Sequence, residues 1–428
     1  MEILDYKGVQ ETLYREVLDN GLEVIVLPKE GFQKTYATFS TKYGSVDNRF
    51  AVGEDEIARV PDGIAHFLEH KMFEEPTGDI FATFASQGAS ANAFTSFDRT
   101  VYLFSATEQI TANLETLIDF VQNPYFTDTN VDKEKGIIEQ EINMYKDNAD
   151  WRVYFGLIDA MYHNHPIHID IAGTVESIYQ IDKETLYRCY ETFYHPSNML
   201  LFVVGNVKAD EVFELVRRNQ AGKNFKPQGE IRRFFEEEPV EVKIPRKITQ
   251  LPVSLSKVMF GFKDKEVGLT GENLLEQEVT TKLMLDALFG ASSALYQDLY
   301  ERDLISDSFG TEFNSSTDYA FSVIGGDSPN PDELLKRVRV AIEEALRTGI
   351  EPAAFERSKR KKIGGYLRML NSPEAIASEF TRYRFRDSDM FDLLPLYESC
   401  TLEQVNERLR EHFDYNQLAV SIVEKPTE

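Results

Sequence analysis

The most informative stretch of the sequence is Gly63-Ile64-Ala65-His66-Phe67-Leu68-Glu69-His70-Lys71-Met72-Phe73. Its apolar residues recur at the spacing of a helix, and a proline at position 61 is typical of a helix's first turn, so we predict a helix over 61–73. On this helix His66 and His70 are one turn apart and share a face, where two imidazoles can bind one Zn²⁺. Glu69 directly precedes His70 and is therefore placed to hold a water molecule beside such a metal.

The H-x-x-E-H order of these residues is a specific signal. It arises by chance in about one chain per hundred of this composition, and it is the inverted-zincin arrangement of two histidines and a glutamate. The neighbours Ile64, Phe67 and Leu68 predict a largely buried helix, and buried histidines beside a buried glutamate need a partner that satisfies them. We therefore expect a metal site rather than two solvated histidines. A catalytic zinc also needs a third protein ligand and an open position.

A second helix, predicted over 131–148, offers the third ligand. One of its faces combines carboxylates with apolar residues at helical spacing: Glu134, Ile137, Ile138, Glu141 and Tyr145. Carboxylates in an apolar stripe are costly unless they meet a cation, and either a metal or an ordinary salt bridge to an arginine would supply one. Glu139 points to a different face. The spacing alone does not choose between Glu134 and Glu141 as the ligand.

The order of elements predicts an α+β fold of two homologous halves, each a mainly antiparallel sheet packed with helices. In the first half the expected strands are 22–28, 35–43, two strands within 90–106, and 199–204. A similar order of strands and helices recurs after residue 255. Residues 223–255 contain four prolines and an acidic run, as is typical of a linker. We therefore predict a zinc-binding catalytic domain over 1–222, an interdomain linker over 223–255, and a homologous domain without metal ligands over 256–428.

The motif and the layout resemble a known family. The stretch 63–73 looks like the signature helix of the pitrilysin/insulinase family of zinc peptidases. The chain length and the two-half layout are similar to the bacterial branch that is like the mitochondrial processing peptidase. The segments 88–95, 134–141 and 194–206 are also similar to family segments, so the resemblance extends over nearly the whole chain.

The resemblance implies roles for residues of the motif and of the second helix. His66, His70 and Glu141 would bind one Zn²⁺ per chain. Glu69 would be the catalytic base, and Glu134 would be an acidic helper two turns before the third ligand. The gap of 71 residues between His70 and Glu141 is slightly shorter than is usual in the family.

The resemblance also implies a substrate and a reaction. An extended peptide would bind along the strand at 88–95, where it would add a strand to the edge of the sheet. The reaction would be hydrolysis of peptides or unfolded segments inside an enclosed chamber, not of folded proteins. The residues expected to bind the substrate are Ser90, Ala91, Asn92 and Ala93.

One departure from the family predicts a partner subunit. Family members carry an arginine and a tyrosine, seven residues apart, that help to bind the substrate carbonyl in the transition state. An ungapped match places Tyr300 and Asp307 at these two positions. Because a donor lost from such a site costs about 2.7–4 kcal/mol, we expect a heterodimer with an inactive paralogue that supplies the pair, with a homodimer as the alternative. A slip in the match that makes Arg302 the missing cation is a rival interpretation.

Composition narrows the function and the location. The 46 basic and 72 acidic residues leave a net charge of −26, which disfavours nucleic-acid and membrane partners. No run of 18 apolar residues predicts a transmembrane helix, and the acidic N-terminus does not resemble a signal peptide. The two cysteines, Cys189 and Cys400, are too few for a disulfide framework. We therefore expect a cytoplasmic zinc metalloprotease.

Two alternatives to a zinc endopeptidase subunit stay open. The chain is either a non-catalytic core or assembly subunit of the same fold, or a metal-independent clamp for extended peptides. The metal content of the purified chain separates the clamp from the peptidase. Cleavage of unstructured peptides separates the core subunit from the peptidase.

Overall fold

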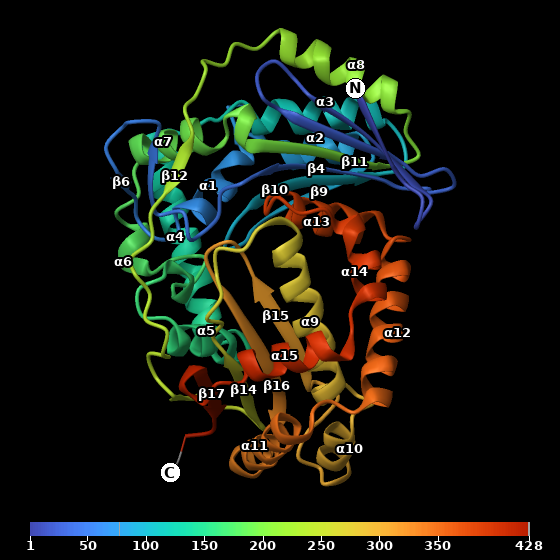
Figure 1. Cartoon of the computed structure of the whole chain (residues 1–428). Coiled ribbons are helices and arrows are strands. Elements are labelled where there is room, and N and C mark those ends of the chain that lie inside the picture. Colours follow the sequence, from blue (N-terminus) through green and yellow to red (C-terminus); the bar gives the residue numbers. More distant parts are fainter. Residues whose placement is uncertain (77, 427–428) are drawn as a thin grey trace. The chain divides into compact units, whose positions relative to one another are not determined.

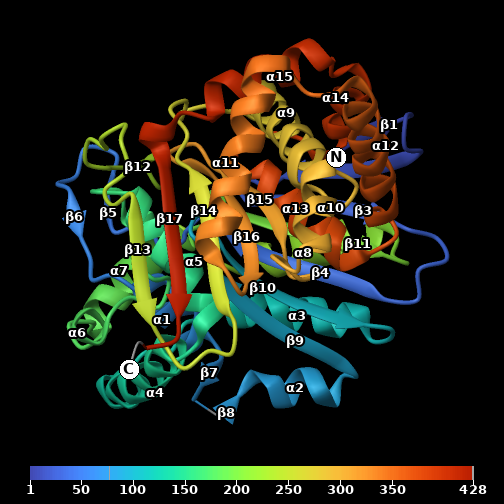
Figure 2. The ribbon, with the colours of Figure 1, turned by 90° about the horizontal axis from the view of Figure 1, so that it is seen from below.

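The computed structural model describes residues 1–76 and 78–426, and the chain divides into two compact units (Figure 1, Figure 2). Unit 1 consists of Met1–Ile142, Ile169–Phe235 and Met369–Phe385, and unit 2 of Asn143–His168, Glu236–Arg368 and Arg386–Glu428. Each unit combines a β-sheet with packed helices, which confirms the predicted α+β class. Within the described ranges, no helix has both the length and the apolar character needed to cross a membrane.

The main sheet of unit 1 has seven strands in the order β1-β2-β3-β11-β4-β10-β9. Neighbouring strands are antiparallel except β3 and β11, which are parallel. β11 is buried along its whole length because its residues are apolar on both faces. The strands are β1 (Glu2–Tyr6), β2 (Glu11–Val17), β3 (Glu23–Pro28), β4 (Thr35–Thr41), β9 (Ala89–Thr95), β10 (Thr100–Ala106) and β11 (Met199–Gly205).

Helices cover both faces of this sheet. Figure 1 shows α2, α3 and α8 on one side of it and α13 on the other. α13 packs on β4 and β11, and its Phe380 stacks on Phe202 with ring centroids 4.7 Å apart. The helices of this unit are α1 (Ile64–Met72), α2 (Ile80–Ser86), α3 (Ile110–Val121), α4 (Asp128–Lys146), α6 (Val175–Ile178), α7 (Lys183–Phe193), α8 (Ala209–Ala221) and α13 (Pro373–Arg384). Short strands complete it: β5 (Arg49–Val52), β6 (Ala58–Arg59), β7 (Glu74–Glu75), β8 (Gly78–Asp79) and β12 (Ile231–Arg233).

The sheet of unit 2 repeats the arrangement of unit 1. Its order is β13-β17-β14-β16-β15, in which only β13 and β17 are parallel. The order β3-β11-β4-β10-β9 in unit 1 has the same strand directions, with the parallel pair in the same place. The two predicted homologous halves are thus visible in the strand order. The strands are β13 (Arg246–Gln250), β14 (Ser256–Phe262), β15 (Gly310–Ser315), β16 (Ala320–Ser328) and β17 (Leu418–Glu424).

Two helices each belong to the unit that is formed mainly by the other half of the chain. α5 follows α4 in the first half of the chain but packs on β14 and β17 of unit 2, and α13 lies late in the chain but belongs to unit 1. Gly156 permits the close approach of α5, because a Cβ there would lie 2.6 Å from Oγ of Ser421. The helices of unit 2 are α5 (Ala149–Met161), α9 (Gly271–Phe289), α10 (Ala294–Glu301), α11 (Pro331–Thr348), α12 (Pro352–Met369), α14 (Leu393–Ser399) and α15 (Leu402–His412).

The stretch 223–255, which the sequence predicts as a linker, changes unit between Phe235 and Glu236. Before that point β12 pairs with β5, and after it β13 pairs with β17. The compact units are therefore assembled from separate stretches of the chain, while the domain boundaries at 1–222, 223–255 and 256–428 stay a prediction.

A half-buried carboxylate holds the histidine-rich loop of unit 2. The carboxylate of Glu238 accepts hydrogen bonds from the backbone N–H groups of His163, Asn164 and His165 at 2.9, 2.7 and 2.8 Å. The ammonium of Lys263 lies 2.6 Å from the same carboxylate. Burial acts to raise the pKa of Glu238, but these donors lower it to about 2. The loop is thus anchored by a carboxylate.

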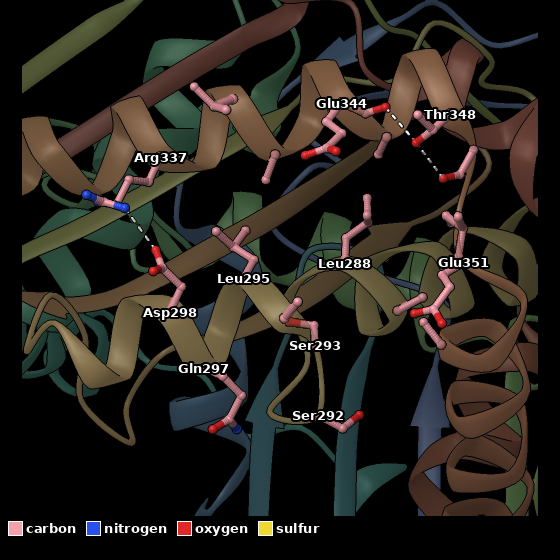
Figure 3. Close-up of a pocket in the computed structure, with 18 of the residues that line it drawn as sticks. Leu288, Ser292, Ser293, Leu295, Gln297, Asp298, Arg337, Glu344, Thr348 and Glu351 are labelled. Carbon is pink, nitrogen blue, oxygen red and sulfur yellow. Dashed lines mark hydrogen bonds and ion pairs between the residues drawn. The ribbon is translucent and has the colours of Figure 1, made fainter.

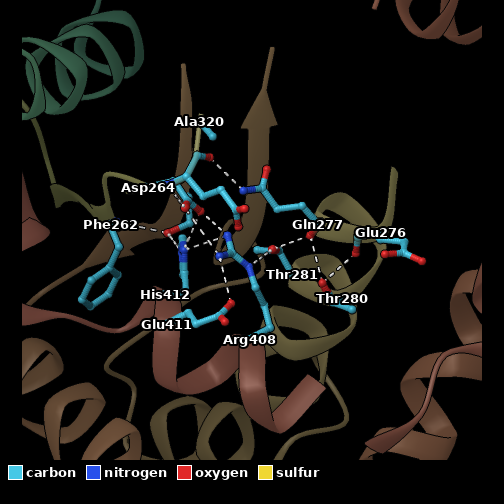
Figure 4. A network of polar contacts seen from close by, with 12 residues as sticks. Phe262, Asp264, Glu276, Gln277, Thr280, Thr281, Ala320, Arg408, Glu411 and His412 are labelled. Atoms are coloured by element: carbon cyan, nitrogen blue, oxygen red, sulfur yellow. Dashed lines mark hydrogen bonds and ion pairs between the residues drawn. The ribbon is translucent and has the colours of Figure 1, made fainter. Parts of the chain in front are cut away.

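A charged network is enclosed between α9, α15 and the sheet of unit 2 (Figure 4). Arg408 forms an ion pair with Asp264 and donates from Nε to Oγ1 of Thr281 at 2.7 Å. The ring of His412 connects Oδ2 of Asp264, at 3.2 Å from Nδ1, to Oγ of Ser322, at 2.8 Å from Nε2. Burial acts to raise the pKa of Asp264, but the contact with His412 and the charge of Arg408 hold it well below its usual range.

Neutralising Asp264 is expected to destabilise unit 2. Asp264→Asn leaves the buried guanidinium of Arg408 without its buried counter-charge, because the remaining partner, Glu411, is exposed, and breaking a buried pair in this way costs about 3–5 kcal/mol. Urea unfolding followed by the fluorescence of Trp151, the single tryptophan and a residue of unit 2, measures the loss. Asp414→Asn, which removes a solvent-accessible ion pair with Lys265, is the control and should cost much less. Equal losses in the two variants would contradict the expectation.

Candidate metal centre

α1 carries the two histidines, and a glycine allows it to start where it does. Gly63 has a φ of +86°, in the left-handed region, and a Cβ there would lie 2.3 Å from the carbonyl oxygen of Ala172. Phe67 and Leu68 are fully buried and belong to the core of unit 1, so the helix is fixed along its apolar face. The opposite side of the helix then presents its polar residues to α4.

Three side chains from α1 and α4 converge. Nε2 of His66 lies 3.8 Å from Oε1 of Glu141, and Nε2 of His70 lies 3.5 Å from Oε2 of the same carboxylate. One potential ligand atom from each of the three residues lies within 4.8 Å of the other two. In the part of the chain that the structure describes, this is the one group of three or more such side chains with metal-binding geometry.

The donor set fits zinc. A tetrahedral zinc with bonds of about 2.0–2.1 Å holds its ligand atoms about 3.4 Å apart, close to the separations of Glu141 from the two histidines. Two imidazoles and one carboxylate also leave a fourth position open, as catalytic zinc sites do. Nδ1 of His66 is buried without a hydrogen-bond partner among the described residues. Among the described residues, no hydrogen bond to Nδ1 therefore fixes the orientation of the His66 ring.

The protonation of His66 suits a metal ligand. Burial and the neighbouring charge of His70 lower the pKa of His66 to about 3, so this imidazole is neutral and offers a lone pair. Burial also acts to lower the pKa of His70, but the hydrogen bond to Glu134 and the nearby carboxylates raise it above its usual value. A metal ion bound at Nε2 would replace the proton that these carboxylates attract.

Glu134 lies beside His70 on the side away from Glu141. Its Oε1 is 3.1 Å from Nδ1 of His70, and its Oε2 accepts a hydrogen bond from Nζ of Lys71 at 3.4 Å. Both carboxylate oxygens therefore have a partner in the protein. Helical spacing alone does not choose between Glu134 and Glu141 as the third ligand. The structure favours Glu141, because of the two carboxylates it is the one that faces the Nε2 atoms of both His66 and His70.

Glu69 occupies a nearly enclosed position next to the two histidines. It is 8% exposed, and its Oε2 accepts a hydrogen bond from Oγ1 of Thr95 at 2.8 Å. Burial raises the pKa of Glu69, and the hydrogen bond from Thr95 only partly opposes this effect. An enclosed carboxylate with a raised pKa is suited to accept a proton near neutral pH.

The expected substrate residues lie on an edge strand of the same unit. β9 pairs with β10 on one side and has no strand on its other side within the described residues. Ser90 and Asn92 are exposed, whereas Ala91 and Ala93 are half-buried. β9 ends at Thr95, the residue that contacts Glu69, so the edge strand and the carboxylate are connected directly.

The residues at the expected Arg/Tyr positions lie in unit 2. Tyr300 is 54% exposed on α10 and stacks on Tyr296, and Asp307 is exposed in the loop that follows α10. Arg302 donates from Nε to Oδ1 of Asp298 at 2.8 Å. The structure therefore shows Arg302 in a surface ion pair.

Unit 2 also contains a groove of about 720 Å³ between α10, α11 and the start of α12 (Figure 3). Leu288 and Leu295 line it, and Nη1 of Arg337 meets Oδ2 of Asp298 at 2.9 Å on its rim. The groove is lined by none of the residues that the sequence predicts for metal or substrate binding.

Sequence reasoning missed two residues that contact this centre, Lys71 and Thr95. Lys71 had a visible signal, because it is the one lysine within an otherwise apolar end of the motif helix. Thr95 had none, because only the pairing of β9 with β10 and the packing of α1 bring its hydroxyl to Glu69.

Comparisons with known proteins place this chain among zinc-peptidase relatives. A family model described as "Insulinase (Peptidase family M16)" matches residues 58–175, and one described as "Peptidase M16 inactive domain" matches residues 180–362. YmfH from Bacillus subtilis (strain 168), named an uncharacterized zinc protease, is 52% identical over 420 residues, which are 97% of each chain.

Solved structures show the same fold. The crystal structure of an M16-like peptidase from Alicyclobacillus acidocaldarius has a TM-score of 0.95 and 42% identity, and covers 97% of this chain and 99% of that chain. A protease from Helicobacter pylori has a TM-score of 0.83 at 22% identity, with 97% and 99% covered, and supports the fold alone.

Removing the carboxylate of Glu141 is expected to abolish tight zinc binding. The wild-type chain should retain about one zinc after dialysis, and Glu141→Gln close to none, because a carboxamide is a poor replacement for the third ligand. Elemental analysis measures the metal. Glu139→Gln is the matched control, since Glu139 lies on the same helix but accepts a hydrogen bond from the hydroxyl of Tyr179 at 2.6 Å. Equal zinc in all three proteins would contradict the assignment of the centre.

Proposed function

The chain belongs to the insulinase family, peptidase family M16, and we propose that it is a zinc metalloendopeptidase subunit. The observation that carries this proposal is the convergence of His66, His70 and Glu141 within 4.8 Å of one another, beside the buried carboxylate of Glu69. The name of the relative YmfH, a zinc protease, supports the same activity. The substrates would be peptides or unfolded segments, which an enclosed chamber of the kind found in this family can admit.

In this proposal His66, His70 and Glu141 hold one Zn²⁺ per chain. When bound, Zn²⁺ lowers the pKa of a water to about 7 and polarises the scissile carbonyl. Glu134 orients His70 through the contact between its Oε1 and Nδ1 of the ring, at 3.1 Å. That contact leaves Nε2 of His70 directed towards Glu141, as a ligand nitrogen must be.

Glu69 is the proposed general base. Its carboxylate takes the proton from the attacking water and then delivers it to the leaving amine. Enclosure of the carboxylate keeps its pKa above the usual value, which makes it a better acceptor for the proton of the water. Both transfers would take place at this one carboxylate.

The substrate would bind as an added strand along β9. Backbone N–H and C=O groups on the outer side of an edge strand pair with any extended chain, so this contact selects for extension more than for sequence. Ser90, Ala91, Asn92 and Ala93 would line the bound peptide. Because β9 ends at Thr95, a peptide that follows this strand passes close to Glu69.

The active form would be a dimer. At the positions where the family has an arginine and a tyrosine the chain has Tyr300 and Asp307, and Arg302 is engaged by Asp298. We propose that a paralogous subunit supplies the missing pair, with a homodimer as the alternative arrangement. The two cysteines are free and buried, which supports a reducing cytoplasmic location.

The second candidate is a non-catalytic core subunit or a peptide-binding clamp. The absence of the Arg/Tyr pair from the matched segment and the match to the M16 inactive domain favour it. The intact set of His66, Glu69, His70 and Glu141 favours the peptidase, because a clamp needs neither the metal ligands nor a buried base.

Glu69→Gln is expected to remove peptide cleavage and to leave zinc bound. A carboxamide of the same shape cannot take the proton from water, and loss of a general base costs about 10²–10⁴-fold in rate. Cleavage of an unstructured peptide library by the native complex, with zinc content measured on the same sample, tests this. Unchanged cleavage by Glu69→Gln would contradict the proposal, and Glu139→Gln serves again as the control.

Adding the paralogous subunit is expected to activate the chain. If the partner supplies the donors that Tyr300 and Asp307 do not, kcat/KM should rise by about 10²–10³-fold on mixing. The measurement compares this chain alone, the paralogue alone and the mixture on one peptide. Full activity of this chain alone would argue for the homodimer.

A further inference from the structure

We propose that Lys71 is a positioning residue of the metal centre. Its buried ammonium holds the carboxylate of Glu134 against His70, and this keeps Nε2 of His70 directed towards the metal. The inference rests on the proposed function, because it assigns a role to Lys71 in a centre that binds Zn²⁺.

The burial of Lys71 is the first observation. Lysine is almost never fully enclosed unless its charge is paired, yet Lys71 is 0% exposed and among the largest fully buried side chains of the chain. It lies in the last turn of α1, directly after His70. Enclosing an ammonium costs several kcal/mol of solvation free energy unless ion pairs or hydrogen bonds offset it. A lysine at this position therefore needs partners of opposite charge.

The partners of Lys71 are the second observation. Its Nζ forms ion pairs with Glu74, in β7, and with Oε2 of Glu134, in α4. Glu74 is half-exposed, with 37% of its side chain accessible, whereas Glu134 is 8% exposed. Lys71 is thus the partner of Oε2 of Glu134 among the described residues, and the other oxygen of that carboxylate lies at Nδ1 of His70.

These contacts form a chain from Lys71 through Glu134 to His70. A carboxylate held at both oxygens cannot rotate, so the atom that accepts from His70 keeps its place. Without Lys71, Oε2 of Glu134 is buried and unpaired, and the carboxylate gains freedom to turn away from the ring. His70 would then lose the group that selects its tautomer and its orientation.

A simple electrostatic role makes the opposite prediction. If Lys71 acted only through its charge, removing a positive charge close to a cation site would tighten zinc binding. If Lys71 acts by holding Glu134, its removal weakens zinc binding, because outer partners of metal ligands typically contribute about 10–100-fold to metal affinity. The sign of the change therefore separates the two roles.

The experiment measures the zinc affinity of the full chain by competition with a chelator. Lys71→Met replaces the ammonium by an apolar side chain of similar length, and we expect zinc to bind about 10–100-fold more weakly. The visible spectrum of the Co²⁺-loaded chain should change as well, since the orientation of a ligand ring is altered. If Lys71→Met does not fold, Lys71→Gln, which keeps a donor without the charge, is measured in its place.

Lys263→Met is the matched control. Lys263 is also buried, at 3% exposed, and forms an ion pair with Glu238 in unit 2. Its removal should lower thermal stability without changing zinc affinity. A variant that only loosens the fold would behave in this way, so the comparison separates positioning from stability.

A double variant tests the route through Glu134. In a Glu134→Gln background, Lys71→Met should change zinc affinity by less than about threefold, because the group through which it acts is already altered. Unchanged or tighter zinc binding by Lys71→Met alone would overturn the inference, as would an equal loss in both backgrounds. Failure of the wild-type chain to bind zinc would instead overturn the proposed function.

Discussion

The structure of this centre depends on how charge is balanced in a small buried volume of unit 1. His66, Glu69, His70, Lys71 and Glu134 are all largely enclosed, and each charged group needs an opposite charge or a hydrogen bond to offset lost solvation. Lys71 satisfies Glu134, Glu134 satisfies one nitrogen of His70, and Thr95 satisfies one oxygen of Glu69. One potential ligand atom from each of His66, His70 and Glu141 lies within 4.8 Å of the other two, so a divalent cation could be bound by all three.

The two units share one strand arrangement but differ in how their buried charges are paired. In unit 2 the buried charges of Asp264, Arg408 and His412 contact one another and Ser322, so the network is closed. In unit 1 the Nε2 atoms of His66 and His70 face the carboxylate of Glu141 at 3.8 and 3.5 Å. The physical difference is that unit 2 pairs its buried charges with one another, whereas unit 1 brings together three groups that can each bind a metal ion.

The site was predictable wherever the chemistry lay within one helix. The spacing of His66, Glu69 and His70 placed these residues together before any contact was known, since four residues make about one helical turn. The spacing of Glu134 and Glu141 was equally regular, but two turns of helix place both on the same face. This spacing does not say which of the two carboxylates contacts the histidines. The contacts of Lys71 and Thr95 join separate elements, and sequence periodicity does not contain such information.

The α+β class, the repeated order of strands and the histidine pair are predictable from the amino-acid sequence, because hydrophobic periodicity and i, i+4 spacing are local properties of a chain. The packing of α5 with unit 2 and of α13 with unit 1 is visible only in three dimensions, since both helices are amphipathic and either sheet offers an apolar face. The tertiary structure also decided that Glu141 faces both Nε2 atoms while Glu134 turns to Lys71. That choice depends on the angle at which two helices meet, and long-range packing sets this angle.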